Sequence, residues 1–232
     1  MNNTLAQSRN WFDRGGEAYA AFRPQYPPAI ASYLASLVPE THLAVDVGCG
    51  TGQLIKLLAP HFTQVIGIDP SADQMANAVQ AENIRYQCSS AEHLRLSEGS
   101  VNLITAAQAA HWFDLPKFYT EVRRVGGANS VLALISYGVP NLEPSLNDRF
   151  QHFYWHEIGA FWSPERQLVD SGYATLDFPF TELEPPSEEI RLNWDLTDFF
   201  GYLSTWSAVR HAREVGRADV YLTYFSFRFS NQ

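Results

Sequence analysis

Three glycines at alternate positions, Gly48, Gly50 and Gly52, constrain this chain more than any other feature. They follow an apolar run that begins at Leu43, and an amphipathic helical pattern begins at Leu54. A strand, a glycine-rich turn and a helix bring the backbone within contact distance of a ligand. The third glycine comes one residue too early for the Gly-x-Gly-x-x-Gly pattern of dinucleotide binders. The spacing therefore favours a nucleoside cofactor over one with a pyrophosphate.

A second apolar run begins at Val65 and ends in a carboxylate, Asp69. Asp69 lies about 20 residues after the first glycine, the distance at which one strand–helix unit returns to the same edge of a sheet. A carboxylate there can accept hydrogen bonds from both hydroxyls of a ribose. Ser71, followed three residues later by Gln74, is typical of a capping box that begins the next helix.

Apolar runs that predict strands alternate with helical patterns, which favours an α/β fold with a parallel sheet covered on both faces. Helices are predicted over Ser8–Phe22, after Pro28, and after a cap at Asp114. The predicted strands span Leu43–Gly48, Gln64–Asp69, Ile84–Cys88, Val101–Ala107 and Ser130–Tyr137.

The alternation stops after Tyr137. The patterns then predict helices over Pro144–Gly159, Ser163–Gly172 and Thr197–Ala212. They also predict β-like runs over Thr175–Leu183, Glu189–Trp194 and Asp219–Ser230.

The composition narrows the class of protein. A length of 232 residues suits one α/β domain with a modest insertion. The net charge of −9, with no cluster of Lys and Arg, argues against nucleic acid as a partner. No apolar run approaches the roughly 20 residues of a membrane span, and the first residues lack a signal-peptide core, so we expect a cytoplasmic protein without stable membrane insertion. Cys49 and Cys88 form no metal-ligand pattern, and no metal is expected.

Four motifs occur in order: VDVGCGTGQ, VIGIDPS, SSAEHL and AAQAAHWFD. Together they resemble the class I S-adenosylmethionine-dependent methyltransferases, and most closely the type 11 group that includes trans-aconitate methyltransferases. The segments FDRGGEAYAAFRPQYP and GYLSTWSAV are similar to the same group. The resemblance implies a three-layer Rossmann-like sheet, mostly parallel with a reversed C-terminal strand, in a single domain over residues 1–232. Residues 1–40 would form a helical N-terminal cover, and residues 138–172 a helical insertion over the substrate pocket.

The resemblance also implies S-adenosyl-L-methionine as the cofactor. Asp69 would bind the ribose, Asp46 would meet the methionine amine, and Ser90 would stand where relatives contact the adenine. Met75 would pack on the adenine or in the core. The residues expected to bind the cofactor are Asp46, Gly48, Gly50, Gly52, Asp69, Ser71, Met75, Ser90, Ala91, Gln108 and Tyr19.

A small-molecule acceptor is expected beyond the cofactor, with Arg23, Tyr26 and Trp112 as substrate residues and His111 as the candidate catalytic residue. If the acceptor is a carboxylate, Arg23 binds it and His111 is dispensable, because a carboxylate is ionised at neutral pH. If the acceptor is apolar or quinone-like, His111 could serve as a base. A protein that binds the cofactor without catalysis is a third interpretation, and the oligomeric state stays open.

Overall fold

The computed structural model describes residues 16–217, without the side chains at positions 16, 18 and 19. Three expectations therefore lie wholly or partly outside the described residues: the cofactor contact of the Tyr19 side chain, the first half of the helix predicted over Ser8–Phe22, and the reversed strand predicted at Asp219–Ser230. Within residues 16–217, no helix combines the length and apolar character that a bilayer span requires.

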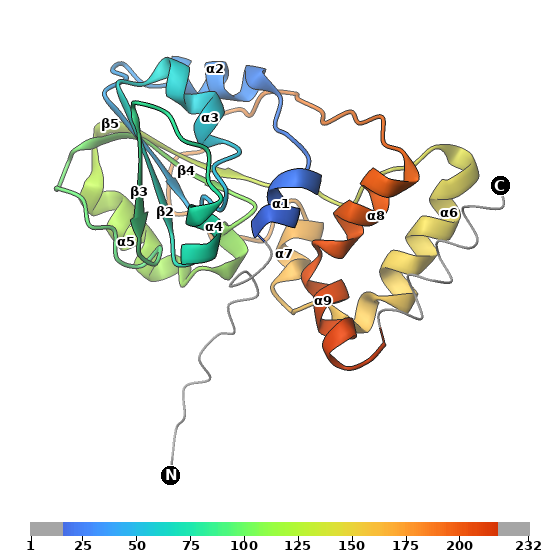
Figure 1. The fold of residues 1–232 in the computed structure, drawn as a ribbon. Helices are drawn as coiled ribbons and strands as arrows, with labels where there is room; N and C mark the ends of the chain where they lie inside the picture. The colour runs from blue at the N-terminus through green and yellow to red at the C-terminus, as the bar shows by residue number, and fades with distance from the viewer. Residues whose placement is uncertain (1–15, 218–232) are drawn as a thin grey trace, which may run out of the picture.

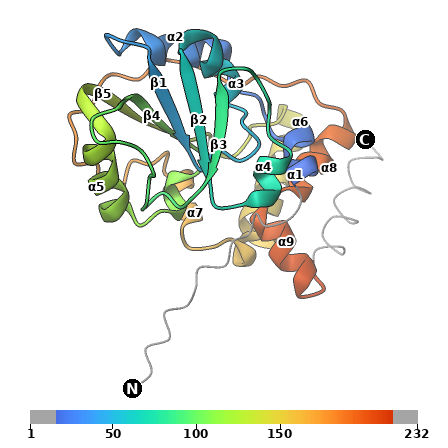
Figure 2. The same ribbon diagram turned by 60° about the vertical axis from the view of Figure 1, so that its left-hand side comes forward.

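The centre of the fold is a five-stranded parallel sheet with the order β3-β2-β1-β4-β5. Its direction of winding reverses between β1 and β4, where open α/β sheets bind ligands. Figures 1 and 2 show the strands side by side. The strands are β1 (Leu43–Val47), β2 (Gln64–Asp69), β3 (Ile84–Cys88), β4 (Val101–Ala107) and β5 (Gly126–Ile135).

All five strands predicted from the apolar runs are confirmed, and the fold is Rossmann-like. The fifth begins at Gly126 rather than Ser130, because the chain passes directly from α5 into the sheet beside Val101. Helices cover both faces, as expected of a buried parallel sheet. The helices in this part are α2 (Pro28–Ser36), α3 (Ile55–Leu58), α4 (Ala72–Ala76) and α5 (Leu115–Val125).

Adjacent residues of β1 point to opposite faces of the sheet. Ala44 packs in a core with α2 and α3, whereas Val45 packs in a second core with α5. The N-terminus of α5 is capped as predicted, since the Asp114 side chain accepts a hydrogen bond from the backbone N–H of Lys117.

The remaining helices form a group beside the sheet, which we call the helical cap (Figure 1). Its core is aromatic and fully buried, and includes Phe150, Phe153, Tyr154 and Trp206. A π turn at Phe153–Glu157 continues the helix predicted from Pro144. The helices of the cap are α1 (Gly16–Phe22), α6 (Pro144–His152), α7 (Arg166–Asp170), α8 (Leu196–Ser204) and α9 (Ser207–Glu214).

Two predictions for the later part of the chain are wrong. The runs Thr175–Leu183 and Glu189–Trp194 form no strand. The apolar side chains of the first run serve packing instead, since Phe178 and Phe180 stack edge-on against Tyr119 of α5, with ring centroids 6.3 and 5.4 Å away.

The helix predicted over Thr197–Ala212 is two helices, α8 and α9. The chain breaks at Trp206, whose ψ of 138° is extended. The break turns the Trp206 ring into the aromatic core, where it meets Tyr202 and Trp162 at centroid distances of 5.4 and 5.2 Å. Tertiary packing therefore overrides a continuous helical pattern.

Gly201 sets how closely α1 approaches α8, because a Cβ at this position would overlap the ring of Phe22. Alanine favours a helix over glycine by about 1 kcal/mol, so an unhindered Gly201→Ala variant would gain stability. We expect Gly201→Ala to lower the melting temperature instead. In a Phe22→Ala background, which removes the ring, adding Gly201→Ala should lower the melting temperature by less. A stability gain in the single variant would contradict this packing.

Candidate functional site

The glycine turn lies at the carboxyl end of β1, and all three of its glycines have positive φ: 70° at Gly48, 53° at Gly50 and 81° at Gly52. A Cβ on Gly48 would lie 2.5 Å from the Cβ of Ala109, so this glycine lets the turn contact the loop after β4. Among the described residues, a Cβ on Gly50 would meet one neighbour, the Gln74 side chain at 3.6 Å, which is an ordinary contact distance. The positive φ, rather than close packing, is therefore what requires glycine at position 50.

Asp69 ties the glycine turn to the end of β2. Its Oδ2 accepts a hydrogen bond from the backbone N–H of Gly50 at 2.9 Å, and its Oδ1 accepts one from Ser71 at 2.8 Å. Burial raises the pKa of Asp69, and the two backbone N–H groups partly offset that effect. The Ser71 side chain caps α4 by accepting from the backbone N–H of Gln74. The other half of the predicted capping box is absent, because the backbone N–H of Ser71 is bound by Asp69 rather than by the Gln74 side chain.

Asp46 is the second buried carboxylate at this edge of the sheet, with 2% of its surface exposed. The hydroxyl of Thr105 donates to its Oδ1 at 2.6 Å. Burial raises the pKa of Asp46 to about 7; the Thr105 hydrogen bond opposes this shift and the charge of Asp69 adds to it. Asp46 therefore exchanges a proton near neutral pH, beside the glycine turn.

The other residues expected to bind the cofactor lie on two neighbouring segments. Met75 is half-buried on α4, Ser90 is exposed after β3, and Ala91 is buried next to it. Glu92 accepts a hydrogen bond from the backbone N–H of Asp114 at 2.9 Å, so it joins the turn after β3 to the start of α5.

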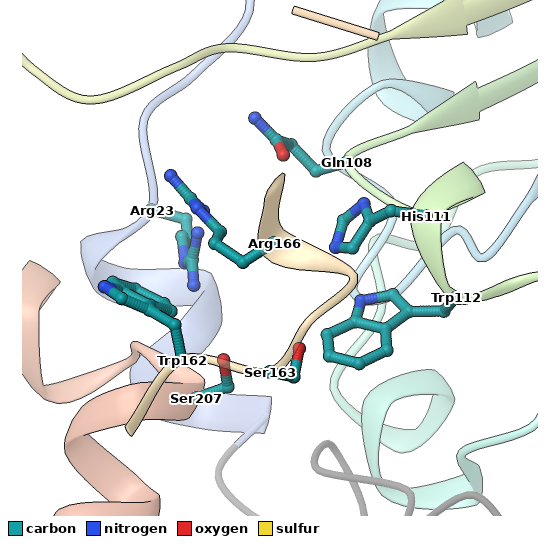
Figure 3. A pocket seen from close by; sticks show the side chains of 8 residues that line it. All are labelled: Arg23, Gln108, His111, Trp112, Trp162, Ser163, Arg166 and Ser207. Atoms are coloured by element: carbon teal, nitrogen blue, oxygen red, sulfur yellow. The ribbon is translucent and has the colours of Figure 1, made fainter. Parts of the chain in front are cut away.

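A pocket lies between the end of β4 and the helical cap. Figure 3 shows Arg166 in its middle, with His111 and Trp112 on one side and Arg23 and Trp162 on the other. The lining side chains come from segments that are far apart in the sequence. They are Arg23, Gln108, His111, Trp112, Trp162, Ser163, Arg166 and Ser207.

Two arginines bring positive charge to the pocket, and both are held in place. Arg23 donates to the Tyr137 hydroxyl at 3.3 Å and to the carbonyl of Thr205 at 3.2 Å. Arg166 pairs with Asp170 at 3.0 Å and lies over the Trp162 ring, 4.8 Å from its centroid. The two guanidinium groups make the pocket locally positive. The chain as a whole is acidic, with a net charge of −9.

Two further hydrogen-bonding groups in the pocket are buried. The indole N–H of Trp162 and the hydroxyl of Ser163 have no hydrogen-bond partner among residues 16–217. Buried polar groups are rarely left without a partner. Both can donate to an anionic or carbonyl oxygen, and so the pocket offers donors as well as positive charge.

His111 lies at the end of β4, and its Nδ1 shares a hydrogen bond with the hydroxyl of Tyr173 at 3.0 Å. Its pKa is lowered to about 3, chiefly by burial and then by the charges of Arg166 and Arg23. His111 is therefore neutral across the physiological range. Among the described residues, the non-glycine positions with positive φ are Gln108 and Tyr173, and both adjoin this pocket.

The structure groups the predicted acceptor residues only in part. Arg23, His111 and Trp112 line the pocket, together with Gln108, whose side-chain N–H donates to the Tyr137 carbonyl at 2.7 Å. Tyr26 is buried outside the lining and packs against Tyr137, with ring centroids 6.1 Å apart.

Four of the residues that line the pocket are not identified from the sequence: Trp162, Ser163, Arg166 and Ser207. A motif beginning at Ser163 was visible as a helix start, but nothing local indicates that α7 approaches the turn at Ala110–Trp112. Within residues 16–217, no group of three or more His, Cys, Asp or Glu side chains could hold a metal ion.

The raised pKa of Asp46 gives a prediction for stability against pH. A raised pKa means that protonated Asp46 stabilises the folded chain at low pH, and that this contribution is lost as the pH rises through about 7. Asp46→Asn keeps an acceptor for Thr105 but carries no charge. We expect the variant to melt at a higher temperature than the wild type at about pH 8, and close to it at about pH 4, near the ordinary pKa of an aspartate. An equal difference at both pH values would show that Asp46 is not protonated in the fold.

Comparison with known proteins places this geometry in a family. A methyltransferase domain model, Methyltransf_11, matches residues 45–134, which hold the glycine turn, Asp69 and the end of β4. A protein of Dictyostelium discoideum named as a methyltransferase is 36% identical over 208 residues, covering 88% of this chain and 79% of the relative. An uncharacterized methyltransferase of Mycobacterium tuberculosis is 31% identical over 174 residues, covering 72% and 64%.

The similarity extends to the helical cap. A solved structure from Anaeromyxobacter dehalogenans, named as a type II methyltransferase, is 40% identical and has a TM-score of 0.79. The match covers 88% of this chain and 87% of the Anaeromyxobacter chain. This chain therefore belongs to the class I S-adenosylmethionine-dependent methyltransferases.

Proposed function

We propose that this methyltransferase methylates a carboxylate oxygen of a small organic acid. The observation that carries the proposal is the pair of guanidinium groups, Arg23 and Arg166, in one pocket beside the glycine turn. Carboxyl methylation is also the reaction that the sequence resemblance to trans-aconitate methyltransferases suggests.

The residues at the glycine turn fit the family's cofactor. The turn carries no side chain at Gly48, Gly50 and Gly52, and the Thr51 hydroxyl is buried with no hydrogen-bond partner in the described part of the chain. We propose that Asp69 binds the ribose hydroxyls and that Asp46 faces the methionine amine. When bound, S-adenosylmethionine supplies a methyl group on a positively charged sulfur.

The pocket's donors match an acceptor carboxylate. Arg guanidinium groups bind carboxylates through paired, charge-assisted hydrogen bonds, and the Trp162 N–H and Ser163 hydroxyl add two donors. A carboxylate is ionised at neutral pH and needs no base before it attacks a methyl group. The protein's contribution is then to hold the acceptor oxygen in line with the methyl group, and such positioning can supply several kcal/mol.

The state of His111 supports the same acceptor. A histidine whose pKa is lowered to about 3 is a poor proton acceptor, so it is badly suited to activate a phenol or a carbon acid. We propose that His111 hydrogen-bonds the acceptor rather than deprotonating it. An apolar, quinone-like acceptor, the other expectation from the sequence, would leave both guanidinium groups facing an uncharged ligand.

The helical segments that surround the pocket would limit the acceptor to a small molecule. Arg23 follows α1, and Trp162, Ser163 and Arg166 come from the 138–172 insertion, so we propose that both segments belong to one methyltransferase domain and cover the acceptor. Ser207 of α9 also lines the pocket. A pocket closed in this way favours a small molecule over a polymer.

The proposed role of Asp69 predicts a loss of cofactor binding. Alanine at this position would leave the N–H groups of both Gly50 and Ser71 without an acceptor, whereas asparagine keeps an acceptor for one of them, so Asp69→Asn is the less disruptive change. We expect Asp69→Asn to weaken binding of S-adenosylhomocysteine by about 1.5–3 kcal/mol in calorimetric titration. Unchanged affinity in a variant that melts like the wild type would exclude the ribose assignment.

If the acceptor is a carboxylate, a change at Arg166 should affect binding of the acceptor but not binding of the cofactor. We expect Arg166→Gln to raise KM for the acid by roughly 10- to 100-fold, because a hydrogen bond to a charged group contributes about 1.5–3 kcal/mol, while affinity for S-adenosylhomocysteine stays the same. The measurement is methyl transfer to a panel of small carboxylic acids and their amides. Arg149→Gln, which breaks the ion pair with Glu157 in the same cap, is the control and should leave KM unchanged. Equal activity on acids and amides would contradict the carboxylate assignment.

A further inference from the structure

Gln74 has a buried carboxamide that the fold itself leaves unsatisfied. The residue lies on α4, directly after β2, and 2% of its surface is exposed. Its backbone N–H is bound by the Ser71 hydroxyl, but the side-chain oxygen and nitrogen have no hydrogen-bond partner among residues 16–217. Leaving a buried amide without partners costs free energy that an apolar side chain of similar volume would not cost.

The carboxamide lies beside the glycine turn. Its Oε1 is 3.6 Å from the place where a Cβ on Gly50 would lie. The backbone N–H of Gly50 is in turn bound to Asp69. Gln74, Gly50 and Asp69 therefore lie together at the glycine turn, although they come from three different elements.

The chemistry of the two side chains is complementary. An ionised carboxylate such as Asp69 only accepts hydrogen bonds, whereas a carboxamide both donates and accepts. A ribose hydroxyl also both donates and accepts. Asp69 can take the hydroxyl protons, but a donor to the hydroxyl oxygens has to come from another group.

We propose that Gln74 is a cofactor-binding residue whose carboxamide hydrogen-bonds the ribose hydroxyls of S-adenosylmethionine beside Asp69. In this arrangement the buried amide finds its partner only in the loaded protein. The Gln74 amide would then serve cofactor binding, and it would destabilise the fold when no cofactor is bound.

The test is calorimetric titration of the full chain with S-adenosylhomocysteine and with its 2′-deoxy and 3′-deoxy analogues. We expect Gln74→Leu to raise the Kd for S-adenosylhomocysteine by about tenfold, the effect of one hydrogen bond. The penalty for removing at least one of the two hydroxyls should shrink in the same variant. Without ligand, Gln74→Leu should melt at the wild-type temperature or above it, because the unsatisfied amide is gone.

The matched control is Gln80→Leu, just beyond α4, whose side chain donates to the Ala78 carbonyl at 3.0 Å. It should leave all three affinities unchanged. Gln74→Met provides a second apolar variant if leucine does not fold. A wild-type Kd in the folded apolar variants would overturn the proposal, as would deoxy penalties that match those of the wild type.

Discussion

The carboxylate of Asp69 is the constraint on which the glycine turn of this protein depends. It accepts backbone N–H groups from the glycine turn after β1 and from the start of α4 after β2, and so it fixes two loops of the sheet relative to each other. Gly48 then brings the turn against Ala109, in the loop that carries His111 and Trp112. One buried side chain thus connects the end of β2 with the pocket through the glycine turn, whose contact with Ala109 only a glycine at position 48 permits.

The helical cap depends on a different interaction, the packing of aromatic rings around Trp206. This core fixes Trp162, and Trp162 supports the guanidinium of Arg166 by a cation–π contact. Positive charge in the pocket is therefore a product of apolar packing some distance away. The two arginines also help to keep His111 neutral. Burial opposes its protonation most, and the charges of Arg166 and Arg23 add to that effect.

Local pattern predicts the sheet well because each buried parallel strand is a short apolar run between polar or glycine residues. It predicts the glycine turn because the glycine spacing is a local feature. It fails at Phe178 and Phe180, whose β-like run packs on α5 without a strand partner, and at Trp206, where tertiary packing breaks a helix. The place of Arg166 in the pocket could not be predicted for a similar reason. It depends on how α7 contacts the turn after β4, and no spacing in the sequence encodes that contact.

The most direct test of the central claim is the chemistry of the product. The full chain would be incubated with S-adenosylmethionine carrying a labelled methyl group and a mixture of small carboxylic acids, and the product then treated with alkali. A methyl ester releases its label as volatile methanol under these conditions, and we predict that result. A label that stays on the acceptor after alkali would mean transfer to carbon, nitrogen or a phenolic oxygen, and would contradict the carboxylate account.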